Sequence, residues 1–286
     1  MYAVMGVTGK VGGAAARALL EAGAPVRAIV RDAAKGRTWS AQADVALADV
    51  HDTPALAAAF TGCEGVFVML PPMFDPSPGF PEAAAMIASL GDALRRSAPG
   101  RIVALSTIGA EATEPNLLNQ LGMLERALAD LPAPVTFLQA AWFIENAAWD
   151  VASARDEGVI RSYLQPLDRA VPMISSEDVG RTAASLLQAP WTGHRVIELE
   201  AAERVTPNAL GQAFADVLGR PVRAEAVPRS EWEAIFRAEG MRNPRPRMQM
   251  LDGFNAGWID FPDHGAGALK GAISLRQAVA ALVRQV

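Results

Sequence analysis

Short apolar runs alternate with longer amphipathic stretches through the first half of the chain. The apolar runs predict strands at 2–6, 26–30, 44–48, 65–70, 101–105 and 134–138, and the stretches between them predict helices near 11–22, 53–60, 81–97 and 116–130. The runs at 65–70 and 101–105 are apolar without alternation, as strands buried on both faces are. This rhythm predicts an α/β fold with a Rossmann-type, doubly wound parallel sheet.

The pattern changes after about residue 150. We expect one long helix near 142–156, short strands near 159–161 and 170–173, further strands at 195–200 and 222–227, and a last helix at 274–286. Helix starts are indicated by Ser175-Ser176 before two acids, by Thr206-Pro207 and by Ser230. We therefore predict an NAD(P)-binding domain at 1–150 and a smaller mixed α/β lobe at 151–286, which closes a substrate pocket and can return a strand to the sheet.

Two segments are interpreted as loops that shape this pocket. Residues 71–81 contain five prolines and cannot form a regular helix or a central strand. Residues 251–261 place Phe254, Trp258 and Phe261 among glycines and polar side chains, where these aromatics either anchor the core or line a substrate site. The candidate pocket residues, taken from these loops and from the end of the sixth predicted strand, are Met73, Phe74, Trp142, Phe143 and Trp258.

Gly6, Gly9 and Gly12 form a Gly-x-x-Gly-x-x-Gly loop. The loop follows the apolar run 2–5 and opens an alanine-rich helical stretch, so it has the flanks of a dinucleotide-binding loop. Gly6 permits a tight turn, Gly9 lets the backbone approach a pyrophosphate, and Gly12 lets helix and strand pack closely. The helix N-terminus then offers free N–H groups and partial positive charge to the phosphates.

The end of the second predicted strand bears on the choice of cofactor. Arg31 is the first residue beyond the apolar run, and its planar, permanently charged group suits the 2′-phosphate of NADP. Lys10 in the glycine loop adds charge. Asp32 could instead hold the ribose hydroxyls of NAD, or cap the short helix that follows. We favour NADP(H), with NAD(H) as the alternative.

The amino-acid composition bears on whether the protein binds membranes, metal ions or nucleic acid. Of the 286 residues 51% are hydrophobic, and no apolar run approaches the roughly 20 residues of a membrane span. The first predicted strand begins at Tyr2, which leaves no room for a signal peptide, so we expect a cytoplasmic protein. Cys63 and three scattered histidines do not favour a metal site. The net charge of −5 disfavours nucleic acid as a default partner. We expect a small-molecule substrate and no membrane, with a homodimer as an open alternative.

Several segments together resemble the NmrA-like group of atypical short-chain dehydrogenases/reductases. The matching pieces are the loop at 6–12 and the segments 28–32, 48–50, 66–72, 104–109, 136–146 and 171–179. The resemblance implies that Thr8, Gly9, Lys10 and Val11 contact the pyrophosphate and that Arg31, assisted by Lys35, holds the 2′-phosphate. It also implies an adenine flanked by Asp49 and Val50 and a nicotinamide side formed by Leu70, Pro71, Ser106, Thr107 and the segment from Ala140 through Ala141 to Phe143. Many relatives have an arginine where Gln139 stands.

Ordinary short-chain dehydrogenases use a tyrosine followed four residues later by a lysine. Here the only tyrosines are Tyr2 and Tyr163 and the only lysines are Lys10, Lys35 and Lys270, so no pair has that spacing. Without this proton donor, quinones, imines or iminium ions, azo compounds and conjugated acceptors suit the chain better than ketones. The remaining catalytic candidates are Ser106, Thr107 and Glu125, although Glu125 could also be a solvated helix residue.

Two functions follow from this sequence. The first is an NADPH-dependent reductase that transfers hydride to an electrophilic, apolar small molecule. The second is a non-catalytic NAD(P)-binding redox sensor of the NmrA type, which the missing catalytic pair favours. Met73, Phe74, Trp142, Phe143 and Trp258 favour the enzyme, because apolar pockets with few polar groups are typical substrate sites.

Overall fold

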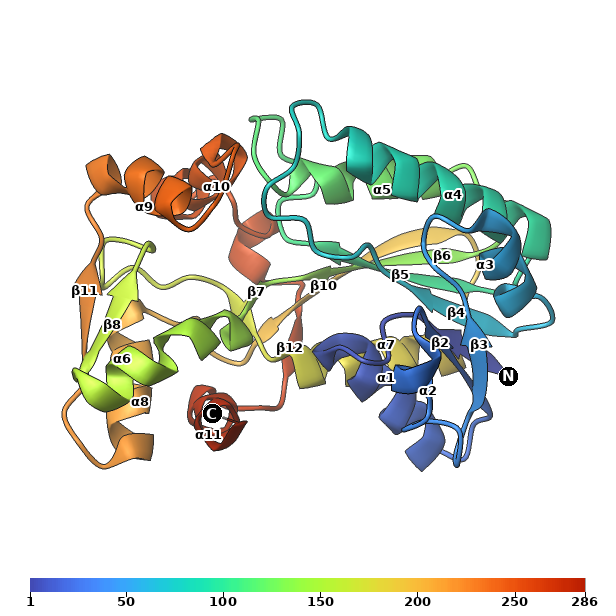
Figure 1. The fold of residues 1–286 in the computed structure, drawn as a ribbon, viewed down its shortest axis with the longest axis horizontal. Helices are drawn as coiled ribbons and strands as arrows, with labels where there is room; N and C mark the ends of the chain where they lie inside the picture. The colour runs from blue at the N-terminus through green and yellow to red at the C-terminus, as the bar shows by residue number, and fades with distance from the viewer. Residues whose placement is uncertain (286) are drawn as a thin grey trace.

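A computed structural model describes residues 1–285 and contains an eight-stranded, fully parallel sheet (Figure 1). The strand order, read across the sheet, is β3 (Asp44–Leu47), β2 (Val26–Val30), β1 (Tyr2–Val4), β4 (Gly65–Val68), β5 (Ile102–Thr107), β6 (Val135–Ala140), β10 (His194–Ala201) and β12 (Leu269–Gly271). This topology confirms the predicted Rossmann-type α/β fold.

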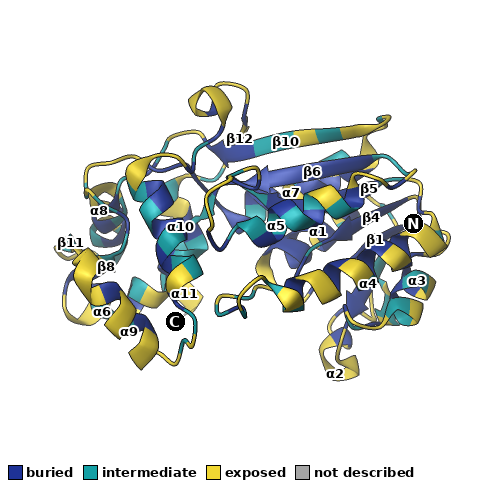
Figure 2. Cartoon of the chain, turned by 90° about the horizontal axis from the view of Figure 1, so that it is seen from above, coloured by how far each residue is buried: buried dark blue, intermediate teal, exposed yellow. Residues whose placement is uncertain are grey.

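Helices cover both faces of the sheet, as a parallel sheet requires. In Figure 1, α3 (Thr53–Phe60), α4 (Pro81–Ser97) and α5 (Asn119–Leu128) lie on one face, and α1 (Lys10–Glu21), the short α2 (Ala33–Gly36) and α7 (Ser176–Gln188) lie on the other. The strands alternate between the two resulting cores: Ile102 and Ala104 of β5 pack with α4, whereas Val103 and Leu105 pack on the side of α1 and α7. Figure 2 shows that the central strands are buried along their length, while the helices expose their outer faces.

The contact between α1 and α7 is unusually close because a glycine stands at the crossing point. A Cβ atom on Gly180 of α7 would lie 2.4 Å from the Cβ of Ala14 and 2.6 Å from the carbonyl oxygen of Val11. Only a residue without a side chain fits there. The contact fixes α1, and with it the glycine loop that precedes α1, against the rest of the domain.

The second half of the chain builds a smaller lobe and also returns to the sheet. Strands β8 (Val159–Ser162) and β11 (Arg223–Ala226) pair beside α6 (Val151–Asp156), α8 (Pro207–Leu218) and α11 (Leu275–Gln285). Phe214, Ile160 and Val279 belong to the core of this lobe. Meanwhile β10, β12 and α7 belong to the large sheet and its cover. The division at residue 150 stays a prediction, and a strand does return across it.

Two of the three predicted helix starts are confirmed. Ser175 accepts a hydrogen bond from the N–H of Glu177 (3.2 Å), and Thr206 accepts one from the N–H of Ala209 (2.9 Å) with Pro207 in the first turn. Ser230 is not a cap: it lies inside the 3-10 turn η2 (Arg229–Glu231), and α9 (Trp232–Ala238) follows without a side-chain cap. The last helix is α11, and the predicted end at Val286 lies outside the described residues.

The single helix predicted at 142–156 is wrong. Trp142 and Phe143 form β7, which pairs with β9 (Met173–Ile174), and the chain continues as the 3-10 helix η1 (Ile144–Asp150) before α6 begins. The N–H of Trp142 donates to the carbonyl of Pro172 (3.2 Å). Pairing with a distant strand has overridden local helical preference here.

The predicted loop at 251–261 is also partly wrong, because α10 (Arg245–Ala256) extends into it. Met248, Leu251 and Phe254 are buried and lie on one side of α10 at helical spacing. The apolar contacts of this side outweigh the weak helix propensity of the Asp-Gly and Asn residues between them. The helix ends where Gly257 adopts a left-handed conformation (φ +85°).

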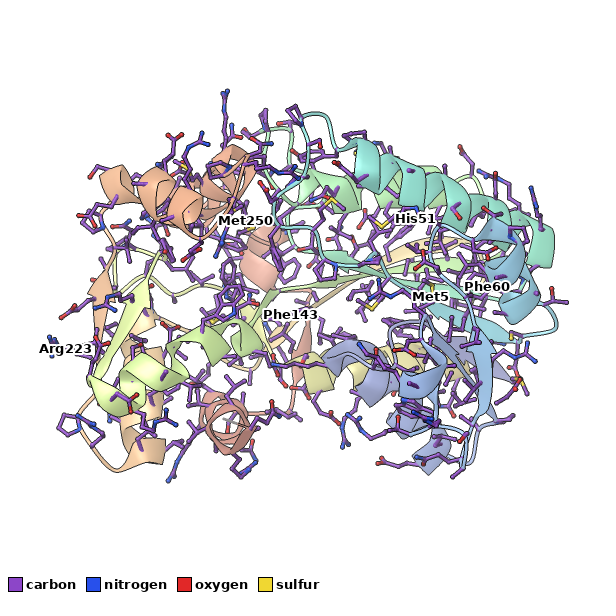
Figure 3. All side chains as sticks on the ribbon, in the orientation of Figure 1. Met5, His51, Phe60, Phe143, Arg223 and Met250 are labelled. Carbon is purple, nitrogen blue, oxygen red and sulfur yellow. The ribbon has the colours of Figure 1, made fainter. Side chains whose placement is uncertain are left out.

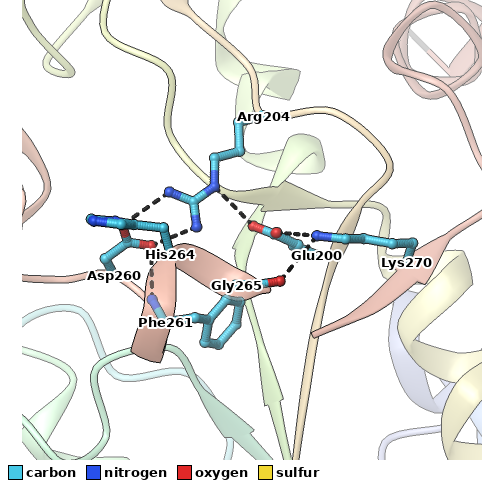
Figure 4. A network of polar contacts seen from close by, with 7 residues as sticks. All are labelled: Glu200, Arg204, Asp260, Phe261, His264, Gly265 and Lys270. Atoms are coloured by element: carbon cyan, nitrogen blue, oxygen red, sulfur yellow. Dashed lines mark hydrogen bonds and ion pairs between the residues drawn. The ribbon is translucent and has the colours of Figure 1, made fainter. Parts of the chain in front are cut away.

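A network of ion pairs fixes the connection between α10 and β12 onto the carboxyl end of β10 (Figure 4). The Glu200 carboxylate, only 3% exposed, accepts from Arg204 Nε (3.2 Å) and pairs with the Lys270 ammonium. Arg204 also binds Asp260 through two bonds of 2.7 and 2.9 Å, and Asp260 contacts His264 Nδ1 (2.8 Å) in the turn η3 (Pro262–Gly265). Each buried charge therefore has an opposite partner.

No helix within residues 1–285 combines the length and apolar character needed to cross a lipid bilayer.

We expect Gly180→Ala to destabilise the protein by about 1–3 kcal/mol, because the added methyl group overlaps the backbone and Ala14 of α1 and must push the two helices apart. Urea unfolding measures the change. Gly267→Ala is the matched control, since a Cβ at Gly267 meets no atom within 4 Å. Equal unfolding midpoints for the two variants would contradict the role of the crossing.

Candidate functional site

Because all eight strands are parallel, their carboxyl ends meet at one edge of the sheet. The chain passes from β1 outward to β3 on one side and from β4 outward on the other, so the order reverses between β1 and β4. Open parallel sheets bind ligands at the carboxyl edge beside such a reversal. Several residues selected from the sequence lie at or just after the carboxyl ends of these strands: Gly6, Arg31, Asp49, Leu70, Thr107 and Ala141.

The glycine loop between β1 and α1 has the shape of a phosphate cradle. Gly6 adopts a left-handed conformation (φ +67°), and the N–H of Gly9 donates to its carbonyl oxygen (2.8 Å). A Cβ on Gly12 would lie 2.4 Å from the carbonyl oxygens of both Met5 and Gly6. The backbone therefore turns so tightly that a side chain at Gly12 cannot be accommodated.

The end of α1 that faces this loop has free donors. Gly9 precedes the helix and provides no side-chain cap, and Thr8, Gly9 and Lys10 are exposed. The N–H groups in the first turn of a helix, here from Lys10 onward through Val11, have no intrahelical acceptor. A pyrophosphate fits this cradle, since it supplies the missing acceptors at the positive end of the helix.

The positive charge near β2 is available for a ligand. Within residues 1–285, Arg31 and Lys35 form no ion pair, and both side chains are exposed. Asp32 is the N-cap of α2 and accepts a hydrogen bond from the N–H of Ala34 (2.8 Å). The carboxylate that could serve NAD thus has a structural partner, whereas the arginine that could serve NADP does not.

The adenine and ribose candidates lie further along the same edge. Asp49 follows β3, is half-buried, and accepts from the N–H of His51 (2.9 Å), while Val50 is buried. Leu70 and Pro71 follow β4, with Leu70 buried and Pro71 half-buried. These positions are compatible with the roles that the family resemblance implies, which stay predictions.

Two of the three catalytic candidates meet in one hydrogen-bonded cluster. The Ser106 hydroxyl donates to Glu125 Oε1 (2.5 Å), and the Gln139 amide donates to the same oxygen (3.0 Å) and to Glu111 (3.4 Å). Ser106 and Gln139 are neighbours across β5 and β6, and Glu125 reaches them from α5. Glu125 is therefore not a solvated helix residue. Gln139 contributes an uncharged amide to the cluster.

The environment of Glu125 changes its acidity. Burial raises its pKa above the ordinary value of 4.5, and the charge of Glu111 raises it further, whereas the hydrogen bonds from Ser106 and Gln139 lower it. Thr107, the third candidate, lies on the opposite face of β5 and is half-buried. No described residue forms a hydrogen bond with the Thr107 hydroxyl. Of the three catalytic candidates, Ser106 and Glu125 are therefore bonded to each other, and Thr107 is not bonded to either.

The predicted pocket residues occupy three places. Trp142 packs edge-to-face on Phe254 of α10 (5.2 Å between ring centroids), and Figure 3 labels Phe143 beside β7. Phe74, beside Met73 in the proline-rich loop, packs on Trp149 of η1 (6.5 Å). Trp258 instead lies over Gly253 at the end of α10, where a Cβ would come within 2.6 Å of its ring.

The sequence did not reveal how firmly α10 and the proline-rich loop are joined. Asp75 accepts hydrogen bonds from the N–H groups of Arg242 (2.9 Å) and Asn243 (2.7 Å), just before α10. Asn243 donates back to the carbonyl of Pro76 (2.8 Å). The only sequence signal for this contact was Asp75 itself, an acid in the middle of the proline-rich loop. Prolines lack a backbone N–H, so such a loop offers few donors of its own, and the carboxylate of Asp75 finds donors in another segment.

Two small cavities are found among the described residues, and neither is lined by the glycine loop. An apolar cavity of about 190 Å³, lined by Leu94, Ile102 and Leu131, lies at the amino-terminal edge of the sheet. A second one of about 50 Å³ lies beside Arg169 and Phe254. Both are small compared with ordinary ligand pockets. Among the described residues, no three His, Cys, Asp or Glu side chains gather to hold a metal ion.

Comparison with known proteins agrees with this geometry. A family model described as NAD(P)H-binding matches residues 6–190. The NAD(P)H azoreductase of Xenophilus azovorans is 27% identical over 272 residues, covering 94% of this chain and 90% of the azoreductase.

Solved structures share the fold over nearly the whole chain. The triphenylmethane reductase of Citrobacter sp. superposes with a TM-score of 0.81 at 21% identity and 99% coverage of both chains. The NADPH-dependent quinone oxidoreductase from Escherichia coli, complexed with NADPH, has a TM-score of 0.80 at 23% identity, again over 99% of both chains. A variant of NmrA has a TM-score of 0.69 at 20% identity, covering 99% of this chain and 90% of its own.

We expect Glu125→Gln to change how stability depends on pH. Since the folded-state pKa of Glu125 is raised above 4.5, the wild-type protein is most stable relative to the variant below about pH 4.5. It loses this advantage as the pH rises from 4.5 through the raised pKa, because the folded state resists ionisation. The glutamine of the variant still accepts from Ser106 but does not titrate.

Urea unfolding between about pH 4 and 8 tests this expectation. The matched control is Glu203→Gln, since Glu203 is exposed and forms no ion pair with the described residues. Parallel pH profiles for the wild-type protein and the Glu125 variant would contradict the assigned environment.

Proposed function

Because the chain belongs to the NAD(P)H-binding family, we propose that it is an NADPH-dependent reductase of electrophilic small molecules. The acceptor is a quinone, an imine or iminium ion, an azo compound or a conjugated acceptor, and no Tyr-x-x-x-Lys pair takes part. The azoreductase likeness over 94% of the chain supports this reaction class. The acceptors in the names of the other relatives, triphenylmethane dyes and quinones, are also electrophilic and conjugated.

The observation that carries the cofactor preference is the unpaired arginine at the end of β2. Arg31 is exposed and free of ion pairs in the described structure, while the neighbouring Asp32 caps α2. A guanidinium binds a phosphate dianion through charge-assisted hydrogen bonds. Lys35 and Lys10 add positive charge around the same edge.

The glycine loop and the first turn of α1 hold the pyrophosphate through Thr8, Gly9, Lys10 and Val11. Asp49 and Val50 flank the adenine, and Leu70, Pro71, Ala141 and Phe143 surround the nicotinamide end. When bound, NADPH supplies a hydride. The chain orients the acceptor against that end with Met73, Phe74, Trp142, Phe143 and Trp258, which present apolar and aromatic surface.

The polar groups at the ends of β5 and β6 stabilise the negative charge on the reduced acceptor and can supply the proton that neutralises it. Thr107 has an unbonded hydroxyl and donates a hydrogen bond to the acceptor atom that gains negative charge. Ser106 and Gln139 hold the Glu125 carboxyl, whose raised pKa favours its protonated form. Hydride addition to an iminium ion needs no proton, and a hydroquinone anion can take one from water, so these groups assist rather than decide the reaction.

We expect Arg31→Ala to weaken NADPH binding about 10- to 100-fold and to change NADH binding less than twofold, because a hydrogen bond to a charged group contributes about 1.5–3 kcal/mol. Calorimetric titration of both cofactors measures this preference. Arg96→Ala is the control, since Arg96 is an exposed arginine of α4 that forms no ion pair with any described residue. Equal losses for NADPH and NADH would contradict the 2′-phosphate role.

We expect NADPH oxidation with quinone, azo and iminium acceptors, and a Thr107→Val variant with kcat lowered about tenfold on quinones and azo compounds but not on iminium ions. Spectrophotometric assays of the two proteins measure this difference. Tight NADPH binding without turnover of any acceptor would instead support a non-catalytic redox sensor of the NmrA type.

A further inference from the structure

Two exposed aromatic side chains meet next to the residues that we propose to orient the acceptor. We call this side of the molecule, from Trp142 outward to Trp149, the acceptor side. Phe74 is 48% exposed and Trp149 is 70% exposed, yet their rings pack edge-to-face with centroids 6.5 Å apart. They come from the proline-rich loop and from η1, which are far apart in the sequence. Adjacent exposed aromatics keep a large apolar surface in contact with water, and such surfaces commonly mark binding sites.

Arg247 of α10 lies against this aromatic pair. Its guanidinium carbon is 5.6 Å from the centroid of the Trp149 ring and 4.3 Å from that of Phe236. The side chain is only 15% exposed, and its burial lowers the pKa of the guanidinium, which nevertheless remains charged. This charge is therefore held beside aromatic surface instead of extending into solvent.

The guanidinium of Arg247 has few partners of its own. The nearest carboxylate is that of Glu239, at 3.7 Å and 52% exposed, and the Nη1 contact with the sulfur of Met241 is also 3.7 Å. Arginine has five N–H donors. None of the Arg247 nitrogens is among the buried unpaired polar atoms of the described residues, so the unused donors keep contact with solvent. They are available to a ligand.

The same helix connects Arg247 to the expected nicotinamide end. Arg247 and Phe254 are two turns apart on one face of α10, which places their backbones about 10 Å apart. Phe254 contacts Trp142, directly after β6, and Arg247 contacts Trp149, near the end of η1. The segment from Trp142 to Trp149 and helix α10 therefore run side by side, with an aromatic contact at each end.

The proline-rich loop holds Phe74 in this arrangement. The residue after it, Asp75, accepts from two backbone N–H groups at Arg242 and Asn243, and these bonds lower the pKa of the Asp75 carboxyl. Residues 241–250 also contain three arginines and no acid, in a chain whose net charge is −5. Asp75 faces Arg242 and Glu239 faces Arg247, so these contacts fix the shape of the segment around Phe74.

We propose that Arg247, Trp149 and Phe74 form an outer subsite for an anionic substituent, a carboxylate or sulfonate, on an aromatic acceptor. The Trp149 ring stacks on the aromatic ring of the acceptor, Phe74 contacts its edge because the two side chains are nearly perpendicular (74°), and Arg247 binds the anionic group. The electrophilic end then lies near Trp142 and Phe143, a separation within reach of a two-ring acceptor. This inference rests on the proposed reductase function for its effect on turnover, but not for the binding itself.

Cationic aromatic compounds are the alternative ligands, since exposed Trp and Phe rings can bind cations through their faces. Arg247 already lies beside the Trp149 ring and repels a second cation. The subsite therefore distinguishes acceptors by charge, which apolar pocket residues alone cannot do.

The test uses three azobenzenes that differ only at the 4-position: the sulfonate, the neutral sulfonamide and the trimethylammonium derivative. Binding to the cofactor-free protein is followed by quenching of tryptophan fluorescence, which requires no turnover. We expect the sulfonate to bind most tightly and Arg247→Met to weaken it about 10- to 100-fold, with the sulfonamide changed less than twofold. Arg247→Lys keeps the positive charge but loses the paired N–H donors of the guanidinium, so we expect it to weaken sulfonate binding less than Arg247→Met does.

Arg229→Met is the matched control, because Arg229 also lies over a tryptophan (Trp232, 4.7 Å) but pairs with Asp252 instead of facing the acceptor side. Circular dichroism confirms that each variant folds. In NADPH oxidation, Arg247→Met should raise KM for the sulfonate and leave kcat unchanged.

Equal affinities of the wild-type protein and Arg247→Met for the sulfonate, or tighter binding of the trimethylammonium compound, would overturn the subsite. Arg247-dependent binding of the sulfonate without turnover of any acceptor would support the subsite while contradicting the reductase. Turnover of the sulfonamide with no effect of Arg247 on either ligand would do the opposite.

Discussion

The close approach of α1 to its neighbours is the constraint on which the rest of the structure depends. Gly12 brings the helix against the turn after β1, and Gly180 lets α7 cross it without a side chain between them. These contacts point the N-terminus of α1 at the carboxyl edge of the sheet, where its free N–H groups face a ligand. The cofactor cradle is thus a consequence of helix packing: a larger residue at either position moves the donors themselves.

Much of this architecture could be predicted from the sequence because local signals agree with the fold. The strand rhythm, the glycine loop and the caps at Ser175 and Thr206 depend on nearby residues only, and the structure reproduces them. The match to the NAD(P)H-binding family confirms the predicted nicotinamide cofactor. Errors arose where distant pairing decides the local structure, as at Trp142, which joins a strand beyond residue 170 instead of continuing a helix.

The residues of the candidate site could be predicted from the sequence, but the hydrogen bonds and contacts between them could not. Ser106 and Glu125 could each be selected by residue type and position, but only the fold brings their side chains together and adds Gln139 as a second donor. Likewise, no pattern relates Arg247 to Trp149, since neither lies in a motif and their contact depends on how α10 packs. Polar side chains in irregular contacts are specified by tertiary geometry, which local periodicity does not encode.

The position of β12 has a consequence for the time course of folding. Its three residues complete the sheet beside β10, yet the two strands are separated by residues 202–268, which build most of the smaller lobe. Parallel neighbours so far apart in the chain raise the contact order and slow the final assembly. During synthesis, β1 to β6 emerge in one continuous stretch. The nascent chain therefore contains the glycine loop and six strands of the sheet before α7, which fixes α1, and the smaller lobe have been synthesised.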